Sequence, residues 1–254
     1  MKSILLRRED IHSGNLILVN QEYGYTGHTQ DDPIPVRKGA DHILVNRKAS
    51  VLLNRLMEEI NGWENIVPVS GWRSGQEQQS IWDSSIAENG MEFTRTYVAF
   101  PGHSEHQTGY AIDLGLRQKE IDFIRPDFPY EGICQIFRGR AASYGFVERY
   151  PDDKEEITKI GHEPWHFRYV GVPHAAIMEE HGMVLEEYLS FLRQFRYGVN
   201  PYLFRRCRQE IMVSYMESID DVITLEMDDS SAYSVSGNNV DGFIITQWRK
   251  NDEY

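Results

Sequence analysis

Apolar side chains recur at steps of three and four residues after Asn46: Ala49, Leu52, Leu53, Leu56 and Ile60. This spacing places them on one face of a helix, which indicates a helix packed against a core. Asn46 is a suitable residue to cap the start of this helix, and Gly62 is placed to end it.

The chain up to residue 196 continues with short strands and helices. Ser74 and Glu77 form a capping box, which predicts a helix from there to about Asn89. Apolar runs, apolar spacing, glycine stops and a proline in a first helical turn predict strands at 66–71, 146–150 and 166–170, and helices at 131–144, 173–182 and 184–195. Arg73 therefore lies at a corner between a strand and a helix, where functional side chains are often presented.

The pattern changes beyond Gly198. Residues 222–225 and 243–246 are β-like runs, and residues 237–239 form a turn sequence. We predict a main domain of residues 1–196 and a β-rich C-terminal extension of residues 197–254. From residue 215 onward nine acidic residues stand against two basic ones, so the extension is acidic, and the sequence indicates no role for it.

The whole chain of 254 residues has a formal net charge of −13. This balance argues against binding to nucleic acid, which needs a clustered cationic face, and disfavours anionic membranes equally. The apolar run at residues 4–6 is too short for a signal peptide, and no segment approaches the ~20 apolar residues of a spanning helix. Cys134 and Cys207 lie far apart without a C-x-x-C partner, which favours a reducing compartment. We expect a cytoplasmic protein with no nucleic-acid or membrane partner.

The histidines and carboxylates indicate a zinc site, because these ligands suit zinc when thiolates are absent. Residues 162–166 match the letters of H-E-x-x-H, a motif in which a helix presents two histidines to the metal. Pro164 opposes a helix here, since proline fits only a first helical turn and biases Glu163 toward extended backbone. The strand-like sequence that follows points the same way, so we reject the helical motif.

A different set of residues fits zinc better. Residues 104–113 predict a loop that carries His106, a tight approach at Gly109, and a strand on which Ala111 and Asp113 share one face. The small side chain of Ala111 leaves room beside Asp113. Together with His166, at the start of its own strand, His106 and Asp113 supply three ligands and leave a fourth position for water. That count is typical of catalytic zinc.

These residues resemble the motifs of the zinc D,D-peptidases related to VanX and VanY, peptidase family M15. The matches are Ser104, His106, Gly109, Ala111 and Asp113 to S-x-H-x-x-G-x-A-x-D, Glu163 and His166 to E-x-x-H, and residues 70–74 with Gln78 to S-G-[YW]-R-S and its downstream Gln. The tail and the missing leader make the bifunctional VanXY enzymes the nearest resemblance. It implies an α+β fold with a central antiparallel sheet and flanking helices. The family motifs do not cover the small β-rich C-terminal extension, which is predicted from the sequence pattern alone.

The resemblance also implies a role for each residue. These roles are binding of Zn²⁺ by His106, Asp113 and His166, general acid–base catalysis by Glu163, oxyanion stabilisation by Arg73, and substrate contact by Ser104, Gln78 and Trp165. The chemistry of the side chains supports them, because a carboxylate can move a proton and a fixed cation can stabilise an oxyanion. His103 and His162 are expected to be structural or supporting residues.

The expected function is zinc-dependent hydrolysis of D-Ala-D-Ala and removal of terminal D-Ala from peptidoglycan precursors in the cytoplasm, as in vancomycin resistance. The expected partner is a small peptide, free or within the UDP-linked pentapeptide. A related L,D-carboxypeptidase or phage-type endopeptidase is an alternative, and a non-catalytic, zinc-stabilised peptide-binding module is another. Residues 122–130 form either a lid or a packed surface loop. A homodimer through the β-like tail is a further hypothesis.

Overall fold

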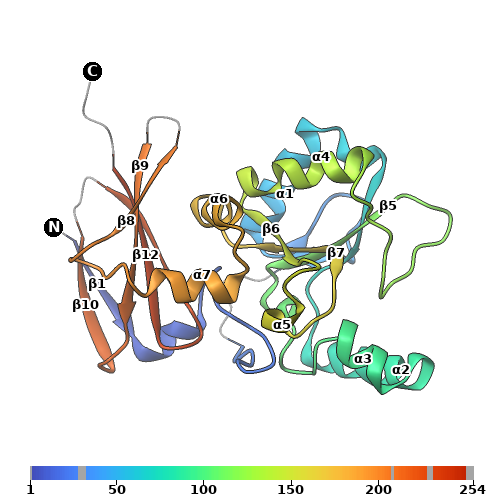
Figure 1. Ribbon diagram of the computed structural model, residues 1–254, viewed down its shortest axis with the longest axis horizontal. Coiled ribbons are helices and arrows are strands. Elements are labelled where there is room, and N and C mark those ends of the chain that lie inside the picture. The colour runs from blue at the N-terminus through green and yellow to red at the C-terminus, as the bar shows by residue number, and fades with distance from the viewer. Residues whose placement is uncertain (1, 28–32, 207–208, 228–230, 250–254) are drawn as a thin grey trace. The chain divides into compact units, whose positions relative to one another are not determined.

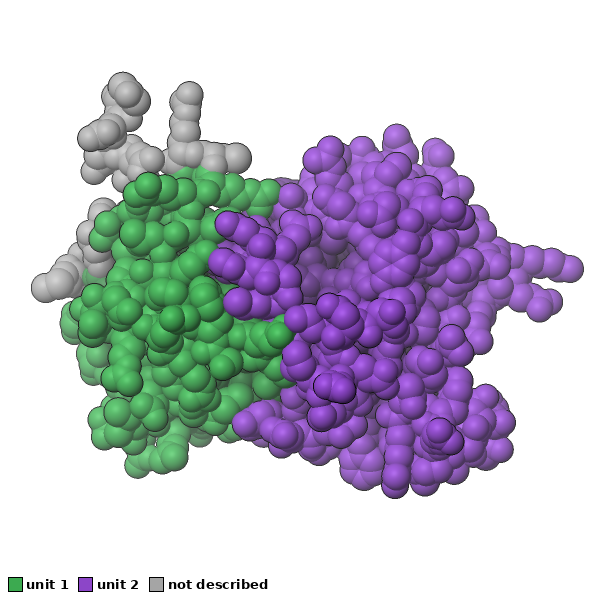
Figure 2. Space-filling model, in the orientation of Figure 1, with its two compact units in different colours: residues 1–18, 185–254 green, residues 19–184 purple. Residues whose placement is uncertain are grey.

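The computed structural model describes residues 2–27, 33–206, 209–227 and 231–249. The chain divides into two compact units, one of residues 1–18 and 185–254 and the other of residues 19–184 (Figure 2). Its helices and antiparallel strands confirm the predicted α+β class (Figure 1). Within the described ranges, no helix combines the length and apolar character needed to cross a membrane.

The unit of residues 19–184 is built on a four-stranded antiparallel sheet in the order β4-β5-β7-β6. The strands of this sheet are β4 (Ile66–Ser70), β5 (Ala111–Leu116), β6 (Phe146–Tyr150) and β7 (Glu163–Tyr169). Two further strands of the unit, β2 (Ile34–Pro35) and β3 (Leu44–Val45), pair with each other. Its helices are α1 (Arg47–Glu59), α2 (Gly75–Asn89), α3 (Met91–Tyr97), α4 (Gly132–Ala141), α5 (Glu155–Thr158) and α6 (Val172–His181). Short 3-10 turns are η2 (Gly62–Glu64), η3 (Glu105–Thr108) and η4 (Ala142–Tyr144).

The alternation of side chains along the strands gives this sheet a core face and a polar face. Ile112 on β5 and Phe167 on β7 are fully buried and belong to one apolar cluster with Leu53 of α1 and Phe137 of α4. Helices α1 and α4 therefore cover the core face (Figure 1). Asp113, next to Ile112, points to the opposite face, since successive strand residues alternate in direction.

The first predicted helix begins where expected and ends earlier. The side chain of Asn46 caps α1 by accepting a hydrogen bond from the backbone nitrogen of Lys48 at 2.9 Å. The predicted stop at Gly62 is wrong, because α1 ends at Glu59 and Asn61 makes the left-handed turn with φ 52°. Asparagine tolerates this conformation because its short polar side chain can bond locally.

The capping box predicted at α2 is confirmed. The backbone nitrogen of Ser74 donates to Oε2 of Glu77 at 2.7 Å, and the backbone nitrogen of Glu77 donates to Oγ of Ser74 at 3.2 Å. Strand β7 includes the letters of H-E-x-x-H from Glu163 onward, so the rejection of a helix there is also confirmed. This strand starts three residues before the predicted His166.

The other unit is mainly β-structure. Its elements are β1 (Lys2–Arg7), η1 (Arg8–His12), α7 (Leu185–Leu192), β8 (Tyr202–Arg206), β9 (Gln209–Glu217), β10 (Val222–Met227), β11 (Ala232–Gly237) and β12 (Gly242–Arg249). A four-stranded sheet has the order β11-β12-β9-β8, and β1 pairs with β10. The predicted runs at 222–225 and 243–246 lie in β10 and β12, whereas β1, β8, β9 and β11 were not anticipated.

The predicted division at residue 196 differs from the observed one. Strand β1 pairs antiparallel with β10, with Leu6 opposite Ile223, so the first 18 residues belong to the C-terminal unit. Helix α7 belongs there too, and the ring centroids of Phe191 and Tyr202 lie 5.4 Å apart. Local patterns could not reveal the pairing of β1, because its partner lies more than two hundred residues away.

Candidate functional site

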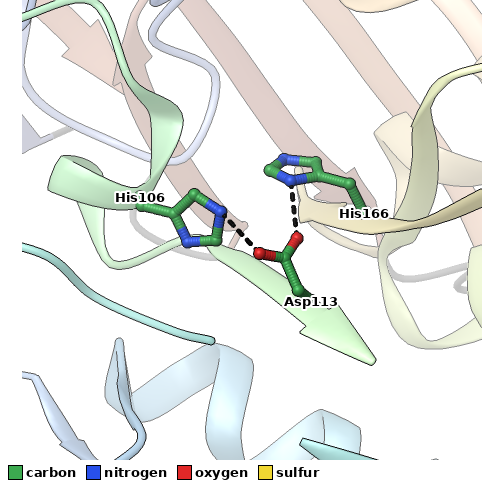
Figure 3. Close-up of side chains that lie close together, drawn as sticks. All are labelled: His106, Asp113 and His166. Carbon is green, nitrogen blue, oxygen red and sulfur yellow. Dashed lines mark hydrogen bonds and ion pairs between the residues drawn. The ribbon is translucent and has the colours of Figure 1, made fainter. Parts of the chain in front are cut away.

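Three buried side chains meet on the polar face of the sheet. Nε2 of His106 lies 3.1 Å from Oδ2 of Asp113, and Nδ1 of His166 lies 2.9 Å from Oδ1 of the same carboxylate (Figure 3). One ligand atom of each residue lies within 4.8 Å of the other two. These atoms could therefore coordinate one metal ion, and the structure brings together the three residues predicted to do so.

The backbone explains why these residues meet. His106 lies in η3, and Gly109 ends that turn in the left-handed conformation with φ 73°, after which β5 begins. Asp113 on β5 stands directly opposite His166 on β7 in the antiparallel pairing. Strand β5 begins at Ala111, which is fully buried, so a larger side chain there would need space that the fold does not have.

The donor set fits zinc in type as well as in position. Two imidazoles and one carboxylate, all buried, are ligands found in zinc sites that keep a position open. Nδ1 of His106 lies 2.6 Å from the carbonyl oxygen of Gly71, and a proton on Nδ1 leaves Nε2 available as a ligand. In His166 the other nitrogen is available as a ligand, because Nδ1 faces Asp113 and Nε2 points away from the three-residue cluster.

Electrostatics keep His106 and Asp113 in the forms that bind metals. Burial and the charge of Arg73 lower the pKa of His106 to about 4, so its imidazole is neutral at pH 7. Burial alone would raise the pKa of Asp113, but its interactions with His106 and His166 outweigh burial and hold that pKa well below the ordinary value. Asp113 is therefore a carboxylate, the form that coordinates a cation. His166 differs, because burial alone would lower its pKa, but hydrogen bonds and charge interactions with the carboxylates around it outweigh burial and raise that pKa to about 9. A metal ion bound there must therefore displace a proton from this ring.

Glu163 lies beside the three residues. Its Oε2 lies 3.7 Å from Nδ1 of His166. On a regular strand, residues three apart face opposite sides, but the register between β6 and β7 shifts so that Glu163 pairs with Tyr150 and Phe167 with Glu148. This irregularity lets Glu163 and His166 face one cavity. Burial raises the pKa of Glu163 to about 8, and the nearby charge of Asp113 also raises it.

Arg73 approaches the same cavity from the corner between β4 and α2. Its Nη2 lies 3.4 Å from Oδ2 of Asp113, and its Nη1 donates to Oε1 of Gln78 at 3.2 Å. Nε2 of Gln78 donates to the carbonyl oxygen of Ala99 at 2.7 Å, and Gln78 is buried. Gln78 therefore holds the guanidinium in place. Nε of Arg73 is buried and has no hydrogen-bond partner among the described residues.

The remaining predicted residues also reach this cavity. Ser104 is buried and lines it, and so does Trp165, which at the same time belongs to the apolar core cluster. Phe123 and Ile124 line it as well, whereas Phe128 is buried in the core. The segment 122–130 thus borders the cavity through Phe123 and Ile124 and is anchored in the core through Phe128.

Two histidines that were expected to be supporting residues lie outside the metal cluster. Nδ1 of His103 lies 2.6 Å from the carbonyl oxygen of Asn20. Nε2 of His162 lies 2.7 Å from the hydroxyl of Tyr130, and the two rings stack.

The sequence reasoning missed a buried carboxylate next to the cluster. Glu105 accepts a hydrogen bond from Nε of Arg149 at 2.8 Å and forms an ion pair with Nη1 of Arg168 at 3.0 Å. Burial raises the pKa of Glu105, but the two guanidinium charges outweigh it and hold the pKa well below the ordinary value. Arg168 lies two residues after His166 on β7, so its position on the site face was available from the strand period.

A buried set of two histidines and one aspartate, with a carboxylate and a guanidinium beside it, defines the site class of a mononuclear metal-dependent hydrolase. A family model described as VanY, D-alanyl-D-alanine carboxypeptidase, matches residues 42–172. The chain belongs to this family.

Similar proteins extend this result. The bifunctional D-Ala-D-Ala dipeptidase and carboxypeptidase VanXYC of Enterococcus gallinarum is 38% identical over 181 residues, which are 70% of this chain and 95% of that protein. The crystal structure of the D,D-dipeptidase VanXYg with a D-Ala-D-Ala phosphinate analogue has 50% identity and a TM-score of 0.95, covering 98% of this chain and 99% of that one. A VanY D,D-pentapeptidase variant in complex with Zn(II) has 30% identity and a TM-score of 0.59, covering 69% and 98%.

Proposed function

We propose that this protein hydrolyses D-Ala-D-Ala and removes the terminal D-Ala of peptidoglycan pentapeptide precursors, with zinc as its cofactor, and thereby contributes to vancomycin resistance. One observation carries the proposal. The buried cluster of His106, Asp113 and His166 lies beside Glu163 in a chain similar over 98% of its length to an enzyme solved with a D-Ala-D-Ala analogue.

The three clustered residues would hold the zinc ion. Bound there, zinc supplies Lewis acidity that polarises a carbonyl and lowers the pKa of water to about 7. Asp113 brings one negative charge, and the two histidines are neutral ligands. The site therefore keeps a net positive charge, which suits a reaction in which negative charge develops on the substrate.

Glu163 is proposed to move the protons of the reaction. It takes a proton from the attacking water and returns it to the amine of the leaving D-Ala. Its buried position supports this role, because burial raises the pKa of its carboxyl group in the metal-free protein to about 8, which makes it a stronger proton acceptor than an exposed glutamate. No second carboxylate is needed for the two transfers, since one group can accept and then donate the same proton.

Arg73 is proposed to stabilise the oxyanion. Its guanidinium is held between Asp113 and Gln78, and its buried Nε has no partner among the described residues. Gln78 lines the cavity and is proposed to contact the substrate, and its hydrogen bonds to Arg73 and to the Ala99 carbonyl also position the guanidinium. Ser104 is proposed to hydrogen-bond the substrate, and Trp165 to form a wall of the cavity.

The proposal is tested by incubating the zinc-loaded protein separately with D-Ala-D-Ala, with L-Ala-D-Ala, with a pentapeptide that ends in D-Ala-D-Ala, and with a tetrapeptide that ends in an L-residue followed by D-Ala. We expect free alanine from the first and a tetrapeptide from the third, and none from L-Ala-D-Ala. Cleavage of a tetrapeptide between an L-residue and D-Ala, with D-Ala-D-Ala intact, would instead establish the L,D-carboxypeptidase alternative. Zinc binding without any hydrolysis would support the peptide-binding module.

The compartment and the assembly belong to the same proposal. We propose the cytoplasm, because the free dipeptide and the UDP-linked precursor are made there, and fractionation of expressing cells tests this. A homodimer through the strands of the C-terminal unit stays a hypothesis. A monomeric mass in solution would contradict it.

A further inference from the structure

We propose that Glu105 is a positioning residue for the metal centre: it accepts a hydrogen bond from Nε2 of His166 and so directs Nδ1 of that ring to the metal. The inference rests on the proposed zinc site. It assigns a purpose to a buried charge network that the catalytic roles above do not use.

The first support for this hydrogen bond is the position of the two atoms that would form it. Oε2 of Glu105 lies 3.6 Å from Nε2 of His166. Both atoms are buried, and neither has a hydrogen-bond partner among the described residues. An unpaired buried donor or acceptor carries a free-energy penalty, because its lost hydrogen bonds to water are not replaced. A shift of a few tenths of an ångström would pair the two atoms and remove both penalties, so the geometry points to a hydrogen bond in the metal-loaded protein.

The other oxygen of Glu105 is already engaged. Oε1 accepts a hydrogen bond from Nε of Arg149 on β6 at 2.8 Å and pairs with Nη1 of Arg168 on β7 at 3.0 Å. The side chains of all three residues are at most 1% exposed. Two buried guanidinium groups thus anchor one oxygen of the carboxylate and leave the second directed at His166.

The position of Glu105 in the chain connects it to both histidine ligands. It is the residue before His106 in η3, and its side chain reaches the ring of His166 on β7. The rings of His106 and His166 meet edge to face with centroids 5.0 Å apart. Glu105 is therefore next to His106 in the backbone, and its side chain is next to the ring of His166.

The hydrogen bond would decide which nitrogen of His166 binds the metal. A neutral imidazole carries one proton, and a carboxylate only accepts hydrogen bonds. Glu105 therefore favours the proton on Nε2 and leaves the lone pair on Nδ1, the atom that faces Asp113 and Glu163. For His106 the two nitrogens exchange roles: the carbonyl oxygen of Gly71 favours the proton on Nδ1 and leaves the lone pair on Nε2. Such partners typically contribute about 10–100-fold to metal affinity.

A purely structural role is the competing explanation. In that case Glu105 only neutralises Arg149 and Arg168, and its substitution lowers stability without a specific effect on zinc. The substitution Glu105→Gln separates the two, because the amide oxygen can still accept from Arg149 while the amide NH₂ is directed at Nε2 of His166. That donor favours the opposite tautomer, with the proton on Nδ1 where the metal should bind.

The test compares zinc affinity in Glu105→Gln, Glu148→Gln and the unchanged protein by competition with a chelator, alongside thermal unfolding of the metal-free forms. Glu148→Gln is the matched control, since Glu148 pairs with Nε of Arg138 at 2.7 Å and lies outside the metal cluster. We expect Glu105→Gln to lose about 10–100-fold in zinc affinity, and Glu148→Gln to lose less than about threefold. Equal losses in the two variants would overturn the proposal.

A second measurement does not depend on the folding of a variant. In the zinc-loaded, unchanged protein with ¹⁵N-labelled histidine, we expect the His166 ring to show a protonated Nε2 and a metal-bound Nδ1. A metal-bound Nε2 would overturn the inference. If the unchanged protein binds no zinc, the proposed function is contradicted as well. If it binds zinc and Glu105→Gln leaves the affinity unchanged, only the positioning role of Glu105 is contradicted.

Discussion

His166 and Asp113 stand opposite each other on β7 and β5, with Nδ1 of the histidine 2.9 Å from Oδ1 of the carboxylate. Residues 53 positions apart in the chain are thereby brought into direct contact. The pair is fixed by strand register rather than by a flexible loop, so the candidate metal site is preorganised by the sheet.

Replacement of Asp113 by Asn should abolish stabilisation by zinc. A metal that binds only the folded chain stabilises it by about 2.7 kcal/mol at a concentration one hundred times its Kd. The amide side chain of this variant would lack the charge that makes the ligand set favourable, so its thermal unfolding should not respond to zinc. The exposed substitution Asp83→Asn serves as control and should keep the full shift. A zinc-dependent rise in Tm in Asp113→Asn equal to that of the unchanged protein would contradict the site.

Glu163→Ala should separate metal binding from hydrolysis. Glu163 is not among the three clustered residues, so zinc content should stay at the level of the unchanged protein. Loss of a positioned acid–base group typically lowers kcat by about 10²–10⁴-fold. Release of alanine from D-Ala-D-Ala measures the effect, with Glu156→Ala on the exposed side of α5 as control. Turnover within about tenfold of the unchanged protein would rule out Glu163 as the base.

Arg73→Ala should lower kcat by about 10²–10³-fold, the usual loss on removal of one oxyanion donor. Arg73→Lys should recover little of it, because an ammonium cannot reach Asp113 and Gln78 together as the planar guanidinium does. Full steady-state kinetics on the dipeptide distinguish this from a binding role, which would raise KM at constant kcat. The exposed Arg140→Ala is the control. An unchanged kcat in Arg73→Ala would remove Arg73 from the reaction.

His174 predicts a dependence of stability on pH. This residue on α6 is buried, and burial lowers its pKa to about 3, against about 6.5 in an unfolded chain. Between these values the unfolded chain binds the extra proton, so the free energy of unfolding falls as the pH drops below about 6.5. The loss from this group approaches about 1.4 kcal/mol per pH unit.

The variant His174→Asn should show a shallower acid loss than the unchanged protein, even if it is less stable at pH 7. Denaturant unfolding from pH 4 to 8, with chelator in all samples, gives the two curves. The metal-free cluster contributes equally to both, so it cancels in their difference. Parallel curves would show that His174 is not the group responsible.

The sequence by itself determined the local structure and the type of site. The cap at Asn46, the capping box at Ser74 and the extended backbone at Pro164 depend on neighbouring residues and backbone sterics, which a sequence contains directly. The choice of His106, Asp113 and His166 followed from ligand chemistry and strand period, and the structure places them within reach of one ion.

Only the tertiary structure decided the features that depend on distant pairing. The register shift that turns Glu163 toward His166 breaks the two-residue period on which a sequence argument relies. Glu105 gains its place only when β6 and β7 bring Arg149 and Arg168 together around it. In the other unit, β1 finds its partner β10 across almost the whole chain. Long-range contacts of this kind leave no local pattern, because their free energy arises from burial and pairing that exist only after folding.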